Sequence, residues 1–123
     1  MKIDIDVPNG KSGDWEVSTF EVSEADARFH NMRESFRGGR LIRSGVYKKL
    51  TRNNVIIMSN TPSEISDHIK FINKAKKSKT ILINGLGLGV ALSEILKSEA
   101  PEEITIIEKS IDVIGLVGKH YLK

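Results

Sequence analysis

The sequence predicts a mixed α/β fold in which amino-terminal β-hairpins and a helix precede the first half of a doubly wound parallel sheet. In residues 1–60, segments with strand character alternate with turn residues. Residues 80–121 follow the order strand, glycine turn, helix, strand, helix. We therefore divide the chain into an amino-terminal β-hairpin and helix region, 1–60, and a second region, 61–123, that holds a truncated parallel sheet.

Composition limits the classes of protein to consider. The chain has 123 residues, of which 39% are hydrophobic and 28% charged, as is typical of one globular domain. No apolar run approaches the ~20 residues that span a bilayer, and the start, MKIDIDVPNG, does not resemble a signal peptide. The absence of cysteine excludes disulfides and thiolate nucleophiles. We expect a cytoplasmic protein with no membrane association and, given three scattered histidines, no metal site.

Two strands and a helix are expected at the start of the chain. Residues 2–7 alternate apolar and polar side chains, and residues 15–22 (WEVSTFEV) form a second strand, so the two predict a hairpin with a long loop. Ser23 and Asp26 have the spacing of a helix capping box, and the helix should stop at Gly38-Gly39. We expect four apolar residues of this helix to pack in the core: Ala25, Phe29, Met32 and Phe36.

A second hairpin and a second helix follow. Residues 47–51 and 55–59 flank Arg52-Asn53-Asn54, and asparagine tolerates the left-handed conformation of a tight turn. Thr61-Pro62-Ser63-Glu64 predicts a helix start with Thr61 as N-cap and Glu64 reaching back to the amide of that residue.

The second region begins with a strand of a different kind. Residues 80–84 (TILIN) form an unalternating apolar run, which predicts a parallel strand that is buried on both faces. Residues 90–97 have a helical pattern, and residues 104–108 (ITIIE) form another such strand. Ser110 is expected to cap a last helix, which Gly115 and Gly118 weaken.

The glycine turn between the first parallel strand and its helix is the main functional signal. Gly85, Gly87 and Gly89 leave the main chain without side chains at the end of a strand, where a nucleotide can approach the backbone closely. Glu108 ends the next strand, 23 positions after Gly85. A carboxylate at that place can accept hydrogen bonds from both hydroxyls of a ribose. The two signals together predict a nucleotide site.

The glycine spacing separates two cofactor classes. The dinucleotide fingerprint requires Gly or Ala at position 90, which is Val, and this disfavours a nicotinamide nucleotide. Gly85-x-Gly87-x-Gly89 resembles instead the first motif of the S-adenosylmethionine-dependent methyltransferases. The resemblance implies S-adenosylmethionine as the cofactor, with its ribose at Glu108 and its bulk along the turn. The turn residues implied are Asn84, Gly85, Leu86, Gly87 and Gly89.

Longer stretches resemble the spermidine synthase-like branch of that superfamily. They are SGVY (44–47), MSNTPSEISDHI (58–69), NGLGLGVALSEIL (84–96) and ITIIEKSIDVIGLVGKHY (104–121). The resemblance implies a Rossmann-like cofactor-binding domain in residues 61–123 and methyl or aminopropyl transfer as the reaction. Asn84 replaces the acid common in the family, and Leu86 and Leu88 are bulkier than the usual residues and would narrow the pocket.

The resemblance also implies an incomplete enzyme. In the family, later strands hold the adenine and the catalytic acid, and the chain ends at Lys123 before any such strand. We therefore expect no complete catalysis by this chain alone, and the acceptor of the transferred group is not indicated. The weak candidates for residual chemistry are Asp67 and His68, the latter as a base. An exposed helix face is the favoured explanation of both.

A noncatalytic binding or assembly module is the alternative. Residues 28–52 contain eight Lys or Arg and the single acid Glu34, a balance that could meet an acidic partner or a nucleic acid. Nucleic acid is disfavoured because Phe29 and Phe36 fall on the expected core stripe, which leaves no stacking platform. Two parallel strands make a small sheet, so a homodimer through an exposed sheet edge is a further expectation.

Overall fold

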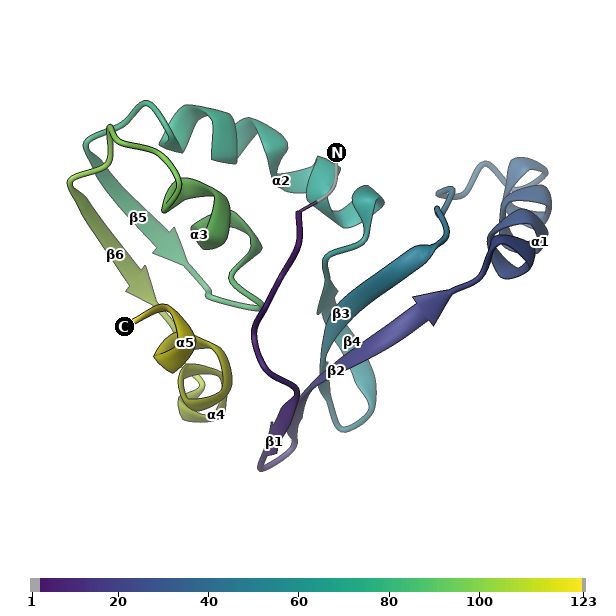
Figure 1. Ribbon diagram of the computed structural model, residues 1–123, viewed down its shortest axis with the longest axis horizontal. Helices are drawn as coiled ribbons and strands as arrows, with labels where there is room; N and C mark the ends of the chain where they lie inside the picture. The colour runs from purple at the N-terminus through teal and green to yellow at the C-terminus, as the bar shows by residue number, and fades with distance from the viewer. Residues whose placement is uncertain (1–2, 123) are drawn as a thin grey trace.

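The computed structural model describes residues 3–122 and shows a mixed α/β chain with two sheets (Figure 1). The first is antiparallel, in the order β1-β2-β3-β4, and the second is the parallel pair β5-β6. The elements are β1 (Gly10–Ser12), β2 (Trp15–Val22), α1 (Glu24–Ser35), β3 (Gly45–Arg52), β4 (Val55–Ser59), α2 (Pro62–Ala75), β5 (Thr80–Asn84), α3 (Val90–Ile95), β6 (Glu103–Ile107), α4 (Ile111–Val113), the π-helix η1 (Ile114–Gly118) and α5 (Lys119–Tyr121).

The antiparallel sheet is built on the long ladder between β2 and β3. This ladder runs from the pair Trp15 and Arg52 to the pair Val22 and Gly45. The turn from β3 to β4 has Asn53 and Asn54 at φ 51° and 65°, the left-handed values that a two-residue hairpin turn requires. The predicted strand 15–22 and the predicted second hairpin are confirmed.

The predicted strand at residues 2–7 is wrong for the part that the structure describes, since Met1 and Lys2 lie outside it. Residues 3–7 are extended and bury Ile3, Ile5 and Val7, but they join no ladder. Side chains take the place of strand partners: Asn60 Nδ2 donates to the Ile3 carbonyl at 2.8 Å, and Lys48 Nζ donates to that of Val7. The first hairpin is instead β1 with β2, and β1 lies inside the segment expected to be a loop.

Helix α1 begins as predicted but turns its apolar side outward. The Ser23 hydroxyl accepts a hydrogen bond from the Asp26 amide at 3.1 Å. Phe29, Met32 and Phe36 are 64%, 60% and 87% exposed, so the expected core stripe is wrong. The helix lies beyond the end of the antiparallel sheet, away from the rest of the molecule, and this position leaves the stripe without a layer to pack against (Figure 1).

Helix α2 connects the two sheets. It starts at Pro62 after Thr61, as expected, but Glu64 does not reach the Thr61 amide. The Glu64 carboxylate accepts from the Ser59 amide and hydroxyl instead, each at 3.0 Å, and so fixes the end of β4 to the first turn of the helix.

The parallel pair is buried on one face only. Thr80 to Asn84 lie in register with Glu103 to Ile107. Ile81 and Ile83 are buried, whereas Leu82 is 59% exposed, so the expectation of burial on both faces is wrong. An unalternating apolar run shows that both faces of a strand are apolar, but it does not show whether another element covers each face. The sequence pattern therefore predicted burial on a face that is exposed.

The carboxyl-terminal helix is interrupted. Ser110 caps it by accepting from the Val113 amide at 3.3 Å, as expected, and the two predicted weak positions, Gly115 and Gly118, both fall in the π-helix. One continuous hydrophobic core joins the regions on either side of residue 60, with Val17 and Leu50 from the first and Ile72 from the second. Among residues 3–122, no helix is long and apolar enough to cross a membrane.

Candidate functional site

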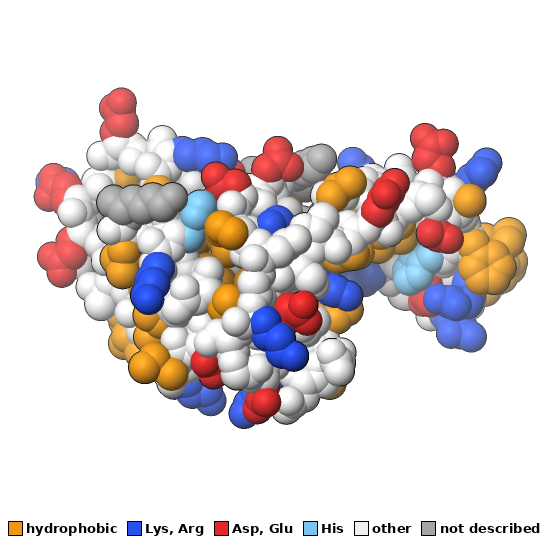
Figure 2. All heavy atoms as spheres, turned by 60° about the horizontal axis from the view of Figure 1, so that its bottom comes forward, with side chains coloured by type: hydrophobic (Ala, Val, Ile, Leu, Met, Phe, Trp, Pro, Cys, Tyr) orange, Lys and Arg blue, Asp and Glu red, His pale blue; other side chains and the backbone are white. Residues whose placement is uncertain are grey.

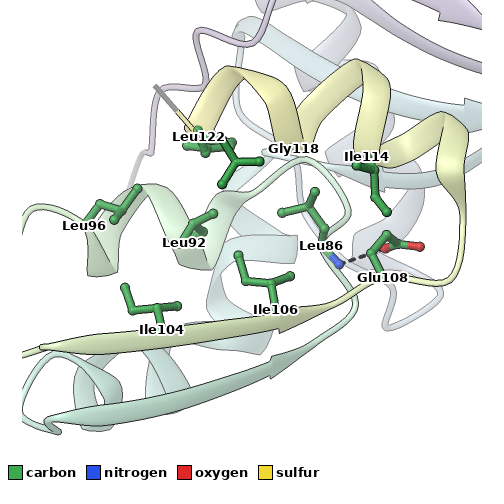
Figure 3. A pocket seen from close by; sticks show the side chains of 10 residues that line it. Leu86, Leu92, Leu96, Ile104, Ile106, Glu108, Ile114, Gly118 and Leu122 are labelled. Atoms are coloured by element: carbon green, nitrogen blue, oxygen red, sulfur yellow. Dashed lines mark hydrogen bonds between the residues drawn. The ribbon is translucent and has the colours of Figure 1, made fainter.

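The glycine turn and Glu108 meet at the carboxyl ends of β5 and β6. Glu108 Oε1 accepts a hydrogen bond from the Leu86 amide at 2.9 Å (Figure 3). Its other oxygen, Oε2, accepts from the Ser110 amide, also at 2.9 Å. The carboxylate is therefore held in one position by two backbone donors, one from each loop. Each oxygen keeps further acceptor capacity because a carboxylate has about four lone-pair sites.

Gly85 is the glycine that faces open space. Its amide donates to the Ile107 carbonyl at 2.7 Å, which continues the contact between β5 and β6 by one residue. Its φ is +94°, and no atom outside residues 84–86 lies within 4 Å of the place that a β-carbon would take. A ligand could therefore approach the main chain at Gly85 without displacing another segment of the protein.

Gly87 leaves no room for a larger residue, because a side chain of the antiparallel sheet packs against it. A β-carbon at Gly87 would collide with the sulfur of Met58, which belongs to β4. The same sulfur lies 3.3 Å from the Leu88 amide as an acceptor. Gly87 thus serves the packing of the antiparallel sheet against the turn.

Gly89 is bare for a similar reason. A β-carbon there would lie 2.8 Å from Cζ of Tyr121, whose hydroxyl donates to the Leu88 carbonyl at 3.3 Å. Burial, with a smaller contribution from the charge of Asp6, raises the pKa of Tyr121 to about 12. No local sequence pattern predicts Met58 or Tyr121 at this turn, because both come from distant elements.

The remaining turn residues differ in orientation. Asn84 is exposed at the end of β5. The side chains of Leu86 and Leu88 are 7% and 0% exposed, so both point into the protein. Leu86 lines the cavity beside the turn, and the expectation that Leu86 and Leu88 narrow the cofactor pocket stays a prediction.

An apolar cavity of about 380 Å³ lies beside the turn. Figure 3 shows aliphatic side chains from β6, α3 and the carboxyl-terminal helices pointing into it, with Glu108 at its edge. Leu86 forms part of its wall together with Leu92, Ile104, Ile106 and Ile114. Glu108 is the one ionisable carboxylate among the lining residues, so the cavity offers apolar contact and little polar recognition.

Asp67 and His68 are not part of this site in the structure. The Asp67 carboxylate pairs with both terminal nitrogens of Arg40 at 2.9 Å, on the exposed side of α2. His68 is partly buried, and no hydrogen bond of its ring is seen within residues 3–122. Neither residue has a contact that links it to the glycine turn, and both remain predictions without geometric support.

Several cations of the basic segment 28–52 already have internal contacts. Arg40 pairs with Asp67, and Lys48 donates to the Val7 carbonyl and to Asn9. Lys49 and Arg52 lie over the rings of Phe20 and Trp15, each at 5.6 Å from the ring centroid. These contacts fit a solvated structural surface better than a phosphate-binding stripe.

Comparisons with known proteins find no relative. No protein-family model, no curated protein and no solved structure matches the chain. Within the described residues 3–122, no group of three His, Asp or Glu side chains could hold a metal ion.

Proposed function

We propose that the chain is the S-adenosylmethionine-binding portion of a methyltransferase or spermidine synthase-like transferase, with a truncated Rossmann-like sheet. The observation that carries the proposal is the open main chain at Gly85 beside Glu108, at the carboxyl ends of two adjacent parallel strands. Ligands of open α/β sheets bind at that edge. The resemblance of the glycine spacing to the methyltransferase motif supports this choice of cofactor.

In this proposal each residue has a limited role. Gly85 gives the cofactor close access to the backbone, and Glu108 accepts hydrogen bonds from the ribose hydroxyls. The Leu86 and Ser110 amides keep the Glu108 carboxylate oriented before the ligand arrives. The bound cofactor would supply an electrophilic carbon on its sulfonium. No described residue beside the turn stands out as a base, so the proposal is one of binding and leaves catalysis by this chain alone unassigned.

The first experiment compares two glycine substitutions by isothermal titration with S-adenosylmethionine and with its demethylated product. Gly85→Ala adds a methyl group where the ligand would lie, at the cost of about 1 kcal/mol of backbone strain. Gly38→Ala is the matched control, because Gly38 also has positive φ, at +70°, and open space around it, far along the chain from the site. We expect binding by the parent and Gly38→Ala, and none by Gly85→Ala.

Glu108→Ala tests the ribose contact in the same titrations. It should weaken binding at least tenfold, as loss of a charged hydrogen-bond acceptor typically does. Because the variant also frees the Leu86 amide, its thermal unfolding is measured beside that of Glu102→Ala, an exposed glutamate outside the site. No heat from a folded parent chain with either ligand would reject the proposed function.

The alternative, a noncatalytic binding or assembly module, gains one observation from the structure. Phe29 and Phe36 are exposed, and Arg28, Arg33 and Arg37 lie near them in the sequence. Nucleic acid was disfavoured because the two rings were expected to be buried, and that reason no longer holds. The internal contacts of Arg40, Lys48, Lys49 and Arg52 weigh against it. Titration with single-stranded oligonucleotides at several salt concentrations tests it, since phosphate binding weakens steeply as salt rises.

The proposal keeps a homodimer through a sheet edge as a possible assembly. Among residues 3–122, β5 pairs with β6 alone, and Leu82 on β5 is 59% exposed. A second chain could pair with this strand.

A further inference from the structure

Helix α1 carries a continuous apolar stripe on its outer side. We define the stripe as Ala25, Phe29, Met32 and Phe36, which are spaced four, three and four residues apart. At about 100° per residue this spacing places all four on one side of the helix. All four are exposed, and Figure 2 shows hydrophobic side chains beside Lys and Arg at the end of the molecule where α1 lies.

The described part of the chain leaves the stripe uncovered, because α1 is attached by its other side. Ala27 is the buried residue of the helix. Asn31 accepts from the Ile42 amide at 2.7 Å and donates to the Ile42 carbonyl at 2.8 Å, and the His30 ring contacts the Arg40 carbonyl at 3.0 Å. These contacts fix the polar side of α1 against residues 40–42 and keep the stripe outward.

The charges beside the stripe are arranged in a self-complementary way. Asp26 and Arg33 fall on the same flank of the helix, at about 100° per residue, and Arg37 follows in the turn after the helix ends at Ser35. Asp26 lies in the first turn and the two arginines lie at the other end, about equally far from the middle of the stripe. A two-fold axis through that middle would bring the acid of one helix beside the arginines of the other.

We propose that a second copy of this chain covers the stripe, with the two α1 helices packed antiparallel. Phe29 and Met32 of each copy form the centre of the contact, and Phe36 of one copy lies near Ala25 of the other. On the charged flank, Asp26 of each copy faces Arg33 and Arg37 of the other. Within residues 3–122, Arg33 otherwise makes an ion pair with Glu34 at 3.5 Å in which the Arg33 side chain is half exposed, and such a pair costs little to rearrange. This inference does not depend on the proposed cofactor.

The area available fits a weak dimer. The exposed parts of Phe29, Met32 and Phe36 amount to about 400 Å² in each copy. With the flanking side chains, the contact reaches roughly the 1,000 Å² that marks the lower end of specific interfaces. Arginine stems beside the rings add apolar cover while their charges stay in water. Self-association should therefore depend on protein concentration.

The test is sedimentation equilibrium of the whole chain over about a hundredfold range of concentration. We expect a reversible monomer and dimer equilibrium. The double variant Phe29→Ser, Phe36→Ser should weaken dimerisation at least tenfold, as truncation of central aromatic anchors does. Leu82→Ser tests the alternative dimer through the edge of β5, because Leu82 is 59% exposed on that strand. If the dimer forms through α1, this variant should dimerise like the parent.

Charge exchange tests the antiparallel arrangement. Asp26→Lys places like charges opposite the arginines, and the double variant Arg33→Glu, Arg37→Glu does the same opposite Asp26. Each alone should dimerise less than the parent, and an equal mixture of the two should recover association, because every opposed pair is then of opposite sign.

Three results would overturn the proposal. The first is a parent chain that stays monomeric at every concentration. A monomeric chain whose stripe binds an oligonucleotide or an anionic vesicle would count as the same result. The second is a dimer that Leu82→Ser abolishes and the double phenylalanine variant does not. The third is a charge-exchange mixture that associates no better than its components.

Discussion

At the scale of single residues, the three glycines of one turn have three different causes. Gly85 faces open space, whereas Gly87 and Gly89 make room for Met58 and Tyr121 of the same protein. The sequence pattern alone assigned all three to a ligand. It placed the turn and Glu108 correctly beside each other, because both belong to strand ends that local pattern predicts. It could not identify Met58 or Tyr121, since a contact across the fold leaves no trace in local spacing.

The packing role of Gly87 leads to a double-mutant test. Gly87→Ala should lower the free energy of unfolding by about 2 kcal/mol, because the added methyl group meets the Met58 sulfur and the residue has φ +55°. In the background of Met58→Ala the same change should cost only the strain of about 1 kcal/mol. Urea unfolding of the four chains measures this coupling. Equal costs in both backgrounds would contradict the packing role.

Tyr121 predicts a loss of stability in alkali. Its pKa in the folded chain is about 12, above the value of about 10 for an unfolded tyrosine. Because the pKa of Tyr121 is raised by folding, Tyr121 contributes its full stabilisation of the folded state below pH ~10. This stabilisation is lost as pH rises toward 12. Urea unfolding from about pH 9 to 11 should show this decline in the parent and a smaller one in Tyr121→Phe. An identical decline in both chains would assign it to other groups.

At the scale of elements, α2 and α3 are joined by a buried carboxylate. Glu94 on α3 accepts from Lys97 Nζ at 2.9 Å and from Lys76 Nζ, at the end of α2, at 3.3 Å. The hydrogen bond from Lys97, aided by Lys76, lowers the pKa of Glu94 against the opposing effect of burial. Two cations thus make a buried acid compatible with the contact between these helices.

Glu94 therefore predicts a loss of stability in acid. Because the pKa of Glu94 is lower in the folded chain, its carboxylate stabilises the folded state at pH values above its unfolded pKa of about 4.3. This stabilisation is lost as pH falls through the lower pKa of the folded chain. Glu94→Gln should be less stable than the parent at pH 7 and should lose less on acidification. Thermal unfolding of both chains from neutral pH to about pH 3 measures the difference. Glu99→Gln, at an exposed position, is the control.

The sequence predicts whether most segments are helix or strand, but it does not predict which elements pack against one another. Strand β2, the hairpin β3-β4 and the starts of α1 and α2 were predicted from alternation, turn asparagines and capping residues. These signals act within about four residues. The outward stripe of α1 and the exposed face of β5 were missed, because an apolar pattern predicts that a side is hydrophobic and not that a layer exists to cover it.

At the scale of the whole molecule, the extended residues 3–7 lie between the two sheets (Figure 1). Ile3, Ile5 and Val7 contribute to the same core as residues of both sheets. Asn60 fixes this segment, since its side chain donates to the Ile3 carbonyl and accepts from the Lys48 amide, each at 2.8 Å. One buried amide thus joins the amino-terminal segment to β3.

Asn60→Ala should lower the free energy of unfolding by about 3 kcal/mol, because it leaves two buried backbone groups without partners. Asn9→Ala is the matched control. Asn9 also makes two side-chain hydrogen bonds, with Thr19 and Lys48, but both are exposed, so its loss should cost less than about 1 kcal/mol. Urea unfolding compares the two. Similar small losses would mean that the segment is not fixed by Asn60.

The beginning and the end of the described chain are joined by direct contacts. Asp6 Oδ1 lies 2.9 Å from His120 Nε2, and the Ser12 hydroxyl donates to Asp112 at 2.6 Å. These pairs are separated by 114 and 100 residues, so they join opposite ends of the described chain. During synthesis, Asp6 and Ser12 precede His120 and Asp112 by 114 and 100 residues, so these two contacts form only after a delay. A circularly permuted chain that joins residue 123 to residue 1 and opens the turn at Asn53-Asn54 would bring these partners close in sequence and shorten that delay.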